Sequence, residues 1–110
     1  MRLYAAGDYA GAIPALRAAA ALKPDAPQMS FFLAACQLLD GDTKAAAAGL
    51  ERTIALGESP YLEEAHFYLA KAWLGLGRVP DARDHLRRTI DLRGRLEQDA
   101  RRLLAQLAAK

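Results

Sequence analysis

The sequence predicts an all-α protein, and three observations lead to this prediction. Hydrophobic residues make up 53% of the 110 residues, and most of them are alanine and leucine, which favour helices. The β-branched side chains, which favour strands, are scarce, and valine occurs only at Val79. Glycine and proline recur at intervals that leave segments of about 14 to 17 residues, a length typical of helices. Such a chain builds its core by packing helix against helix.

Six helices are expected after a short helical stub at 2–6, and their expected bounds are 9–22, 27–40, 43–56, 60–76, 80–93 and 95–109. The first lies between Gly7 and Pro24, and Pro14 within it is expected to bend its start because proline cannot donate the helical hydrogen bond. The second begins at Pro27, where proline is tolerated, and ends before Gly41.

The later helices follow the same rules. The third lies between two glycine-containing breaks, and the fourth opens at Pro60 with Glu63 in its first turn, where a negative charge favours the helix dipole. The fifth opens at Pro80 with Asp81 behind it, and the sixth follows Gly94. The linkers are short, so consecutive helices are expected to form antiparallel hairpins.

The sequence repeats itself with a spacing of 34 and then 36 residues, measured between Gly7, Gly41 and Gly77. Each glycine is followed by an alanine five residues later and a leucine nine residues later. These are Ala12, Ala46 and Ala82, then Leu16, Leu50 and Leu86; the match continues with Ala19, Thr53 and Thr89, then Leu22, Leu56 and Leu92. A fixed period of this length is typical of stacked helical hairpins.

This pattern resembles the tetratricopeptide repeat, over residues 1–94. The pairs Leu33-Ala34 and Leu69-Ala70 occupy the large and small positions of the first helix, and the residues just aligned occupy those of the second. Some positions depart from the family pattern, since Gln37 stands where an aromatic residue is usual, while Trp73 fills the equivalent position of the next unit. Thr53 and Thr89 also replace alanine, and Gly94 replaces the closing proline.

The resemblance implies an α-solenoid of antiparallel helix hairpins, with about two and a half repeats plus a C-terminal capping helix. We expect a truncated repeat at 1–26, full repeats at 27–59 and 60–94, and the capping helix at 95–110. The first unit lacks most of its first helix. The chain is therefore expected either to be a fragment of a longer repeat protein or to cover this open N-terminal edge with a second copy, as a homodimer.

Residues able to carry out chemistry are few and scattered. His66, His85 and Cys36 show no spacing typical of a metal site. His66 lies among apolar residues and is expected to be a packing histidine, with a ligand or base as the alternative, whereas His85 lies beside charged residues and is expected to be solvated. Cys36 is expected to behave as a small hydrophobe. We therefore expect no enzyme, catalytic residue, metal, cofactor or small-molecule substrate.

Arginine is concentrated in the second half of a chain whose net charge is +2. This band could face phosphates, so weak nucleic-acid binding is one alternative function. Acidic residues alternate with the arginines, however, and Asp84 and Asp91 precede Arg88 and Arg95 by one helical turn. Such alternation usually marks a solvated helix face with ion pairs of roughly 0.3 to 0.5 kcal/mol each, so nucleic acid is the less favoured partner.

The resemblance implies a concave groove, lined by the first helices of the repeats, that binds peptides. The residues expected to line it are Tyr4, Gln28, Phe31, Ala35, Leu38, Glu64, Phe67, Lys71 and Leu74, with Leu39 on the same face. Most are apolar, and only Lys71 could serve a clamp for a terminal carboxylate, so an apolar segment anchored near Phe31, Phe67 and Leu74 is expected. The alternative is that these side chains pack against further repeats or another copy.

The expected function is a non-catalytic scaffold or adaptor that binds a peptide or partner segment. A purely structural end segment of a longer repeat protein is the alternative. No run of about 18 apolar residues lacks charges, so no membrane span is expected. The start offers no secretory signal, which makes the cytoplasm the default. The segment 59–72 resembles one found in bacterial tetratricopeptide proteins, so a periplasmic or membrane-anchored parent protein is the other expectation.

Overall fold

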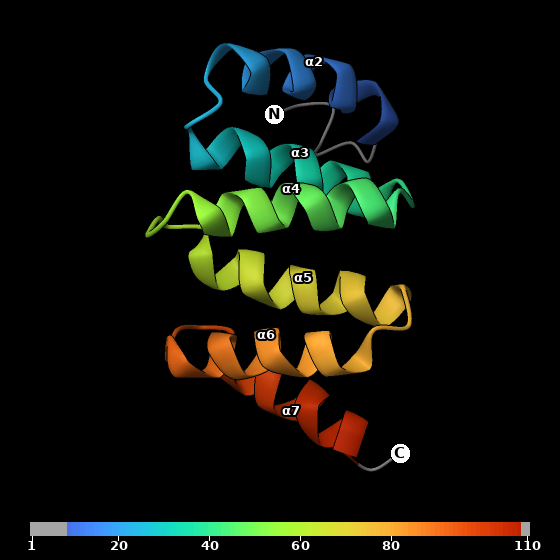
Figure 1. The fold of residues 1–110 in the computed structure, drawn as a ribbon, viewed down its shortest axis with the longest axis vertical. Coiled ribbons are helices and arrows are strands. Elements are labelled where there is room, and N and C mark those ends of the chain that lie inside the picture. The colour runs from blue at the N-terminus through green and yellow to red at the C-terminus, as the bar shows by residue number, and fades with distance from the viewer. Residues whose placement is uncertain (1–8, 109–110) are drawn as a thin grey trace.

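The computed structural model describes residues 9–108, in which six helices and no strand occur (Figure 1). They are α2 (Tyr9–Leu22), α3 (Pro27–Leu39), α4 (Thr43–Ala55), α5 (Leu62–Gly75), α6 (Val79–Asp91) and α7 (Glu97–Ala108). The stub expected at 2–6, and Tyr4 with it, lies outside the described residues. The all-α prediction is confirmed.

The helices stack one after another into an elongated body of 41 × 26 × 22 Å. Figure 1 shows the connections alternating between the two sides of the stack, so neighbouring helices run antiparallel, with α2 at one end and α7 at the other. Each helix packs on the next along the chain, and α3 also touches α5. This arrangement, in which contacts stay between near neighbours, is that of a helical repeat protein.

Two helices begin later than expected, and the local turns explain why. Helix α5 begins at Leu62 rather than at residue 60, because the backbone N–H of Tyr61 donates to Ser59 Oγ (3.2 Å) and holds the chain in a turn. Helix α7 begins at Glu97 rather than at residue 95, after a turn in which the backbone N–H of Glu97 donates to the carbonyl oxygen of Gly94 (3.2 Å). Arg93, with a φ of 53° in the left-handed region, follows the end of the preceding helix α6. A non-glycine residue in that conformation interrupts the helix.

The core consists of the repeated small and large positions. Ala46 and Leu50 are fully buried in one repeat, and Ala82 and Leu86 are fully buried in the next. One cluster joins α3, α4 and α5, a second joins α5, α6 and α7, and a smaller one joins α2 and α3. No single hairpin covers its own apolar faces, so stacking builds the core.

The two threonines that replace alanine are buried without leaving a polar atom unpaired. Thr53 Oγ1 donates to the carbonyl oxygen of Gly49 (2.9 Å) and lies 2.8 Å from Ser30 Oγ. Thr89 Oγ1 donates to the carbonyl oxygen of His85 (2.8 Å). These hydrogen bonds offset the cost of burying a hydroxyl group, which explains how the chain departs from the family pattern here.

Replacing Ala82 by leucine is expected to lower the free energy of unfolding by about 1 to 3 kcal/mol. Ala82 is fully buried against Phe67 and Ala70, so the larger side chain has no space. Chemical denaturation of both proteins measures the difference. Ala55→Leu is the control, because Ala55 is exposed on α4, and it should change stability little. Full stability of Ala82→Leu would contradict the register of the repeats.

Candidate binding groove

Two adjoining hollows lie along α5 and meet at Tyr68. The first, of about 240 Å³, lies between α3 and α5 and is lined by Phe31, Phe32, Ala35, Leu38, Leu39, Glu64 and Tyr68. The second, of about 360 Å³, lies between α5 and α7 and is lined by Phe67, Tyr68, Lys71, Leu96, Asp99, Arg102, Leu103 and Gln106. We call the two hollows together the α3–α5–α7 groove.

Most of the residues expected in the groove lie in these hollows. The first hollow contains Phe31, Ala35, Leu38, Leu39 and Glu64, and the second contains Phe67 and Lys71. Two of the others lie elsewhere: Gln28 is exposed outside both hollows, and Leu74 packs half-buried against the core cluster of α5, α6 and α7. Tyr4 lies outside the described residues.

Phe31 and Phe67 form the floor of the groove and also belong to the core. Their exposed fractions are 5% and 6%. The ring of Phe31 stacks on Tyr61 with a centroid distance of 5.1 Å and lies 6.3 Å from Tyr68. A partner in the groove would therefore reach only one edge of either ring, whereas Leu39, at 53% exposed, offers most of its side chain.

Sequence reasoning missed Phe32 and Tyr68, Leu96 in the turn before α7, and the four lining residues from α7. Tyr68 lies one helical turn after Glu64 and three residues before Lys71, so helical spacing from these two predicted residues was a signal that could have found it. The α7 residues gave no such signal, because the last helix was expected only to cap the stack. In the structure it also closes one side of the groove.

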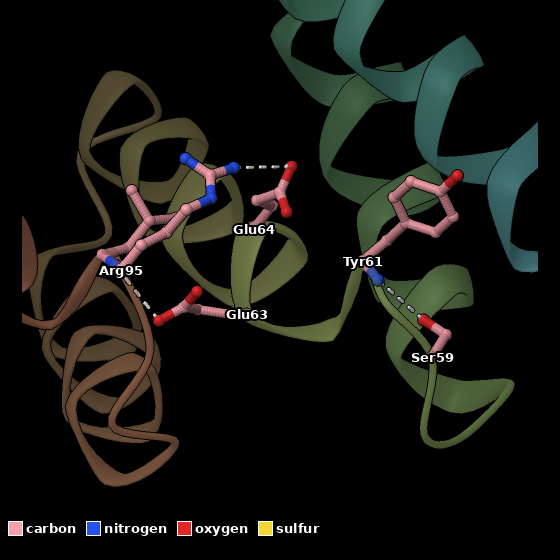
Figure 2. A network of polar contacts seen from close by, with 6 residues as sticks. Ser59, Tyr61, Glu63, Glu64 and Arg95 are labelled. Atoms are coloured by element: carbon pink, nitrogen blue, oxygen red, sulfur yellow. Dashed lines mark hydrogen bonds and ion pairs between the residues drawn. The ribbon is translucent and has the colours of Figure 1, made fainter.

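Acidic residues at the start of α5 hold the turn that leads into α7 (Figure 2). The backbone N–H of Leu96 donates to Glu63 Oε2 (3.1 Å), and Arg95 Nη2 lies 3.2 Å from Glu64 Oε2. Gly94 packs so closely on Glu63 that a Cβ there would overlap the carboxylate. These contacts place α7 beside α5, and they give Arg95 a partner other than the expected Asp91.

Charged side chains surround the apolar floor of the groove. Asp99 lies 3.7 Å from Arg102, and Glu64 is held by Arg95. Lys71 Nζ lies 4.9 Å above the ring of Phe67, a cation–π contact, and within residues 9–108 it has no ion pair. The groove thus combines an apolar base with a polar rim, as binding surfaces commonly do.

The arginine-rich half of the chain carries several ion pairs. Arg87 lies 3.6 Å from Asp84 and Arg101 lies 2.8 Å from Glu97, in addition to the pairs at Arg95 and Arg102. Asp84 thus pairs with the arginine three residues on, not with Arg88 as expected. These exposed pairs are individually weak, and they place carboxylates among the cations that a nucleic acid would have to contact.

The two histidines contact each other, whereas the cysteine is buried elsewhere in the core. His85 is half-buried, and its Nδ1 lies 2.9 Å from Nδ1 of His66, so the expectation that it is solvated is wrong. Cys36 is fully buried, and burial raises the pKa of its thiol, which disfavours the reactive thiolate. Within residues 9–108, no three potential metal ligands among His, Cys, Asp and Glu come together.

No helix in the described part of the chain has both the length and the apolar character needed to cross a membrane.

Comparison with known proteins supports the repeat assignment. The family model described as tetratricopeptide repeat matches residues 1–63 and 61–95. None of the curated proteins matches the sequence.

Among solved structures, the type III secretion translocator chaperone SycD of Yersinia enterocolitica aligns with a TM-score of 0.91 at 18% identity, covering 98% of this chain and 77% of that chain. A second SycD structure, described as an alternative dimer, aligns with a TM-score of 0.81 at 19% identity, covering 98% and 83%. MamA aligns with a TM-score of 0.75 at 21% identity, covering 81% of this chain and 51% of MamA. At these identities the likeness establishes the fold alone. With the family model matching most of its length, the chain belongs to the tetratricopeptide repeat family.

Proposed function

We propose that this protein is a non-catalytic interaction module that holds a segment of a partner protein in the α3–α5–α7 groove. The observation behind this proposal is that two hollows adjoin at Tyr68 and share an apolar floor. A segment lying along α5 would place one apolar side chain in each hollow, on either side of the tyrosine. Such grooves bind through a few apolar anchors, while a polar rim excludes water.

The fold relatives are compatible with a protein partner. SycD is a chaperone of secretion translocators by its own description, and its fold covers 98% of this chain. The charged rim contributes selectivity rather than affinity, because exposed ion pairs are weak. Lys71 is the rim cation that lacks an ion pair within residues 9–108, so it is the group we expect a carboxylate of the partner to approach.

The outer face of α2 favours the alternative function, in which this protein is a purely structural end segment of a longer repeat protein. Arg17 is the only charged residue in this helix, and Leu22 is 84% exposed. A face so poor in charge suits packing against another helix, from a longer chain or from a second copy in a homodimer. No residue of α2 lines either hollow of the groove, so separate substitutions distinguish these two uses.

Replacing Leu39 by serine is expected to weaken partner binding about tenfold, the effect of losing roughly 1.4 kcal/mol at one apolar anchor. Leu39 is the most exposed apolar side chain in the groove, so helicity should be unchanged. The measurement compares the proteins that immobilised wild type and variant retain from a lysate, quantified by mass spectrometry. Partners identified with the wild type are then titrated as purified proteins.

Two matched leucines serve as controls. Leu92 is 44% exposed and lies outside the groove, beside residues 58–63, so Leu92→Ser should retain the same partners as the wild type. If Leu22→Ser reduces retention while Leu39→Ser leaves it intact, the outer face of α2 is the binding surface and the groove assignment is wrong. If all three variants retain the same partners in the same amounts as the wild type, both the groove assignment and the α2 assignment are wrong.

A further inference from the structure

The two histidines meet at the contact between α5 and α6. Nδ1 of His66 lies 2.9 Å from Nδ1 of His85, with ring centroids 5.2 Å apart and an interplanar angle of 29°. Because the two Nδ1 atoms are much closer together than the two ring centroids, the rings meet edge to edge. The two Nδ1 atoms therefore point at one another, and a single proton between them makes an N–H···N hydrogen bond.

The preceding repeat has small residues where this pair stands. In the aligned sequence Ser30 corresponds to His66, and Gly49 corresponds to His85. Gly49 lies so close to α3 that a Cβ there would come within 2.9 Å of Ala34 Cβ. The α3–α4 hairpin thus packs tightly through small side chains, whereas two imidazole rings lie between α5 and α6. The pair is a feature of this repeat, not of the fold.

Charged groups around the pair act on both rings. Burial, the neighbouring His85 and then Arg88 lower the pKa of His66 to about 4. Burial and Arg88 also lower the pKa of His85, and Asp84, Glu51 and Asp81 partly oppose this effect. The nearby carboxylates come from α4 and α6, so they favour the first added proton on His85 and leave His66 as the last group to be protonated.

The number of protons on the pair decides whether the contact survives. When both rings are neutral, one Nδ1 donates and the other accepts. One added proton can sit on the far side of the donor ring, and the hydrogen bond remains. A second added proton turns the acceptor into a donor, so that two N–H groups and two positive charges face each other. At this distance and in this buried position, that state is strongly disfavoured.

We propose that the His66–His85 contact is an acid-sensitive device that keeps α5 against α6 until both rings are protonated and then releases them. Helix α6 also packs on α7, and the second core cluster spans α5, α6 and α7. Separating α5 from α6 therefore loosens the C-terminal half of the stack and the hollow between α5 and α7. Helices α3 and α4 have no histidine and should respond less.

The lowered pKa of His66 determines how the free energy of unfolding changes with pH. A base whose pKa is lowered by folding binds more protons in the unfolded chain, so its contribution to stability is present above the unfolded value and is lost as the pH falls. For His66 the loss runs from about pH 6.5 towards pH 4. From this group alone, the folding equilibrium constant should fall on the order of 100-fold between pH 7 and pH 4.

The test compares urea denaturation of the wild type at pH 7, 5.5 and 4 with that of His66→Ser/His85→Ala. The substitution His66→Ser introduces the residue found at the aligned position of the preceding repeat, Ser30. The substitution His85→Ala introduces the residue found at the aligned position of the first repeat, Ala15. Carboxylates change stability with pH in both proteins, so the difference between the two slopes isolates the histidine pair. We expect the variant to lose on the order of 100-fold less in its folding equilibrium constant over this range.

One further measurement keeps the proposal falsifiable if the double variant folds poorly, and a second variant serves as a control without a titrating group. Titration of the imidazole nitrogens by NMR in the wild type should show His66 charging well below pH 6. Thr53→Val removes the buried Ser30–Thr53 contact in the α3–α4 hairpin, and it should lower stability equally at every pH. Ordinary titration of both histidines near pH 6.5, or equal slopes for wild type and double variant, overturns the proposal. No partner is used, so the outcome is independent of the groove.

Discussion

Replacing Phe31 by alanine is expected to lower the free energy of unfolding by about 3 to 5 kcal/mol. Phe31 is 5% exposed, packs with Ala34, Leu50 and Leu69, and stacks on Tyr61. Removing the ring leaves a cavity between α3 and α5 that the backbone cannot close without shifting both helices. Urea denaturation of wild type and variant, with the slope checked for constancy, measures this loss.

Phe32→Ala is the matched control for this prediction. Phe32 is the neighbouring phenylalanine on α3 and is only partly buried, at the edge of the same core cluster, so its removal should cost clearly less. If Phe31→Ala were as stable as the wild type, the ring would act only as a surface anchor. Because we expect a large loss, Phe31→Ala cannot serve as a test of partner binding, and Leu39→Ser takes that role.

Replacing Leu69 by alanine is expected to cost about 2 to 5 kcal/mol. Leu69 is fully buried where α5 meets α3 and α4, among Phe31, Ala47 and Leu50. Loss of its methyl groups removes contacts between two successive repeats, and those contacts are what a stacked fold depends on. Thermal and urea unfolding of the same samples give the change.

Leu33→Ala separates the role of repeat position from that of burial. Leu33 occupies the same position in the preceding repeat, but it is only partly buried, near Leu16 and Cys36. We expect a smaller loss than for Leu69→Ala. Equal losses would mean that position in the repeat, rather than the neighbours each leucine meets, sets the cost.

Most of the fold was predictable because repeats encode it locally. The spacing of Gly41 and Gly77 and of the alanines and leucines behind them marks turns and buried positions within one hairpin, where contacts are close in sequence. Both glycines adopt positive φ, of 93° and 78°, which glycine tolerates best. The starts of α5 and α7 were predicted less well, because hydrogen bonds local to each turn set them, from Tyr61 N–H to Ser59 Oγ and from Glu97 N–H to the carbonyl oxygen of Gly94.

The groove was predictable only on its α3 and α5 sides. Phe31, Ala35 and Leu38 follow helical spacing on one face, so the sequence places them together once the fold is assumed. The α7 side depends on the angle at which the last helix returns. That angle is held by contacts from Glu63 and Glu64 to residues 95 and 96, more than thirty positions along the chain, and no periodicity encodes it.

The sequence by itself determined that this protein is all-α, that it repeats, and that alanines and leucines recur at fixed positions of each hairpin, because helix formation and repeat packing depend on residues close together along the chain. Tertiary structure alone decided that Phe31 and Phe67 are both core and groove floor, that α7 closes the groove, and that His66 meets His85. Each of these depends on how one helix lies across another. That geometry comes from the balance of many side-chain contacts between helices, which cannot be summed from a single segment.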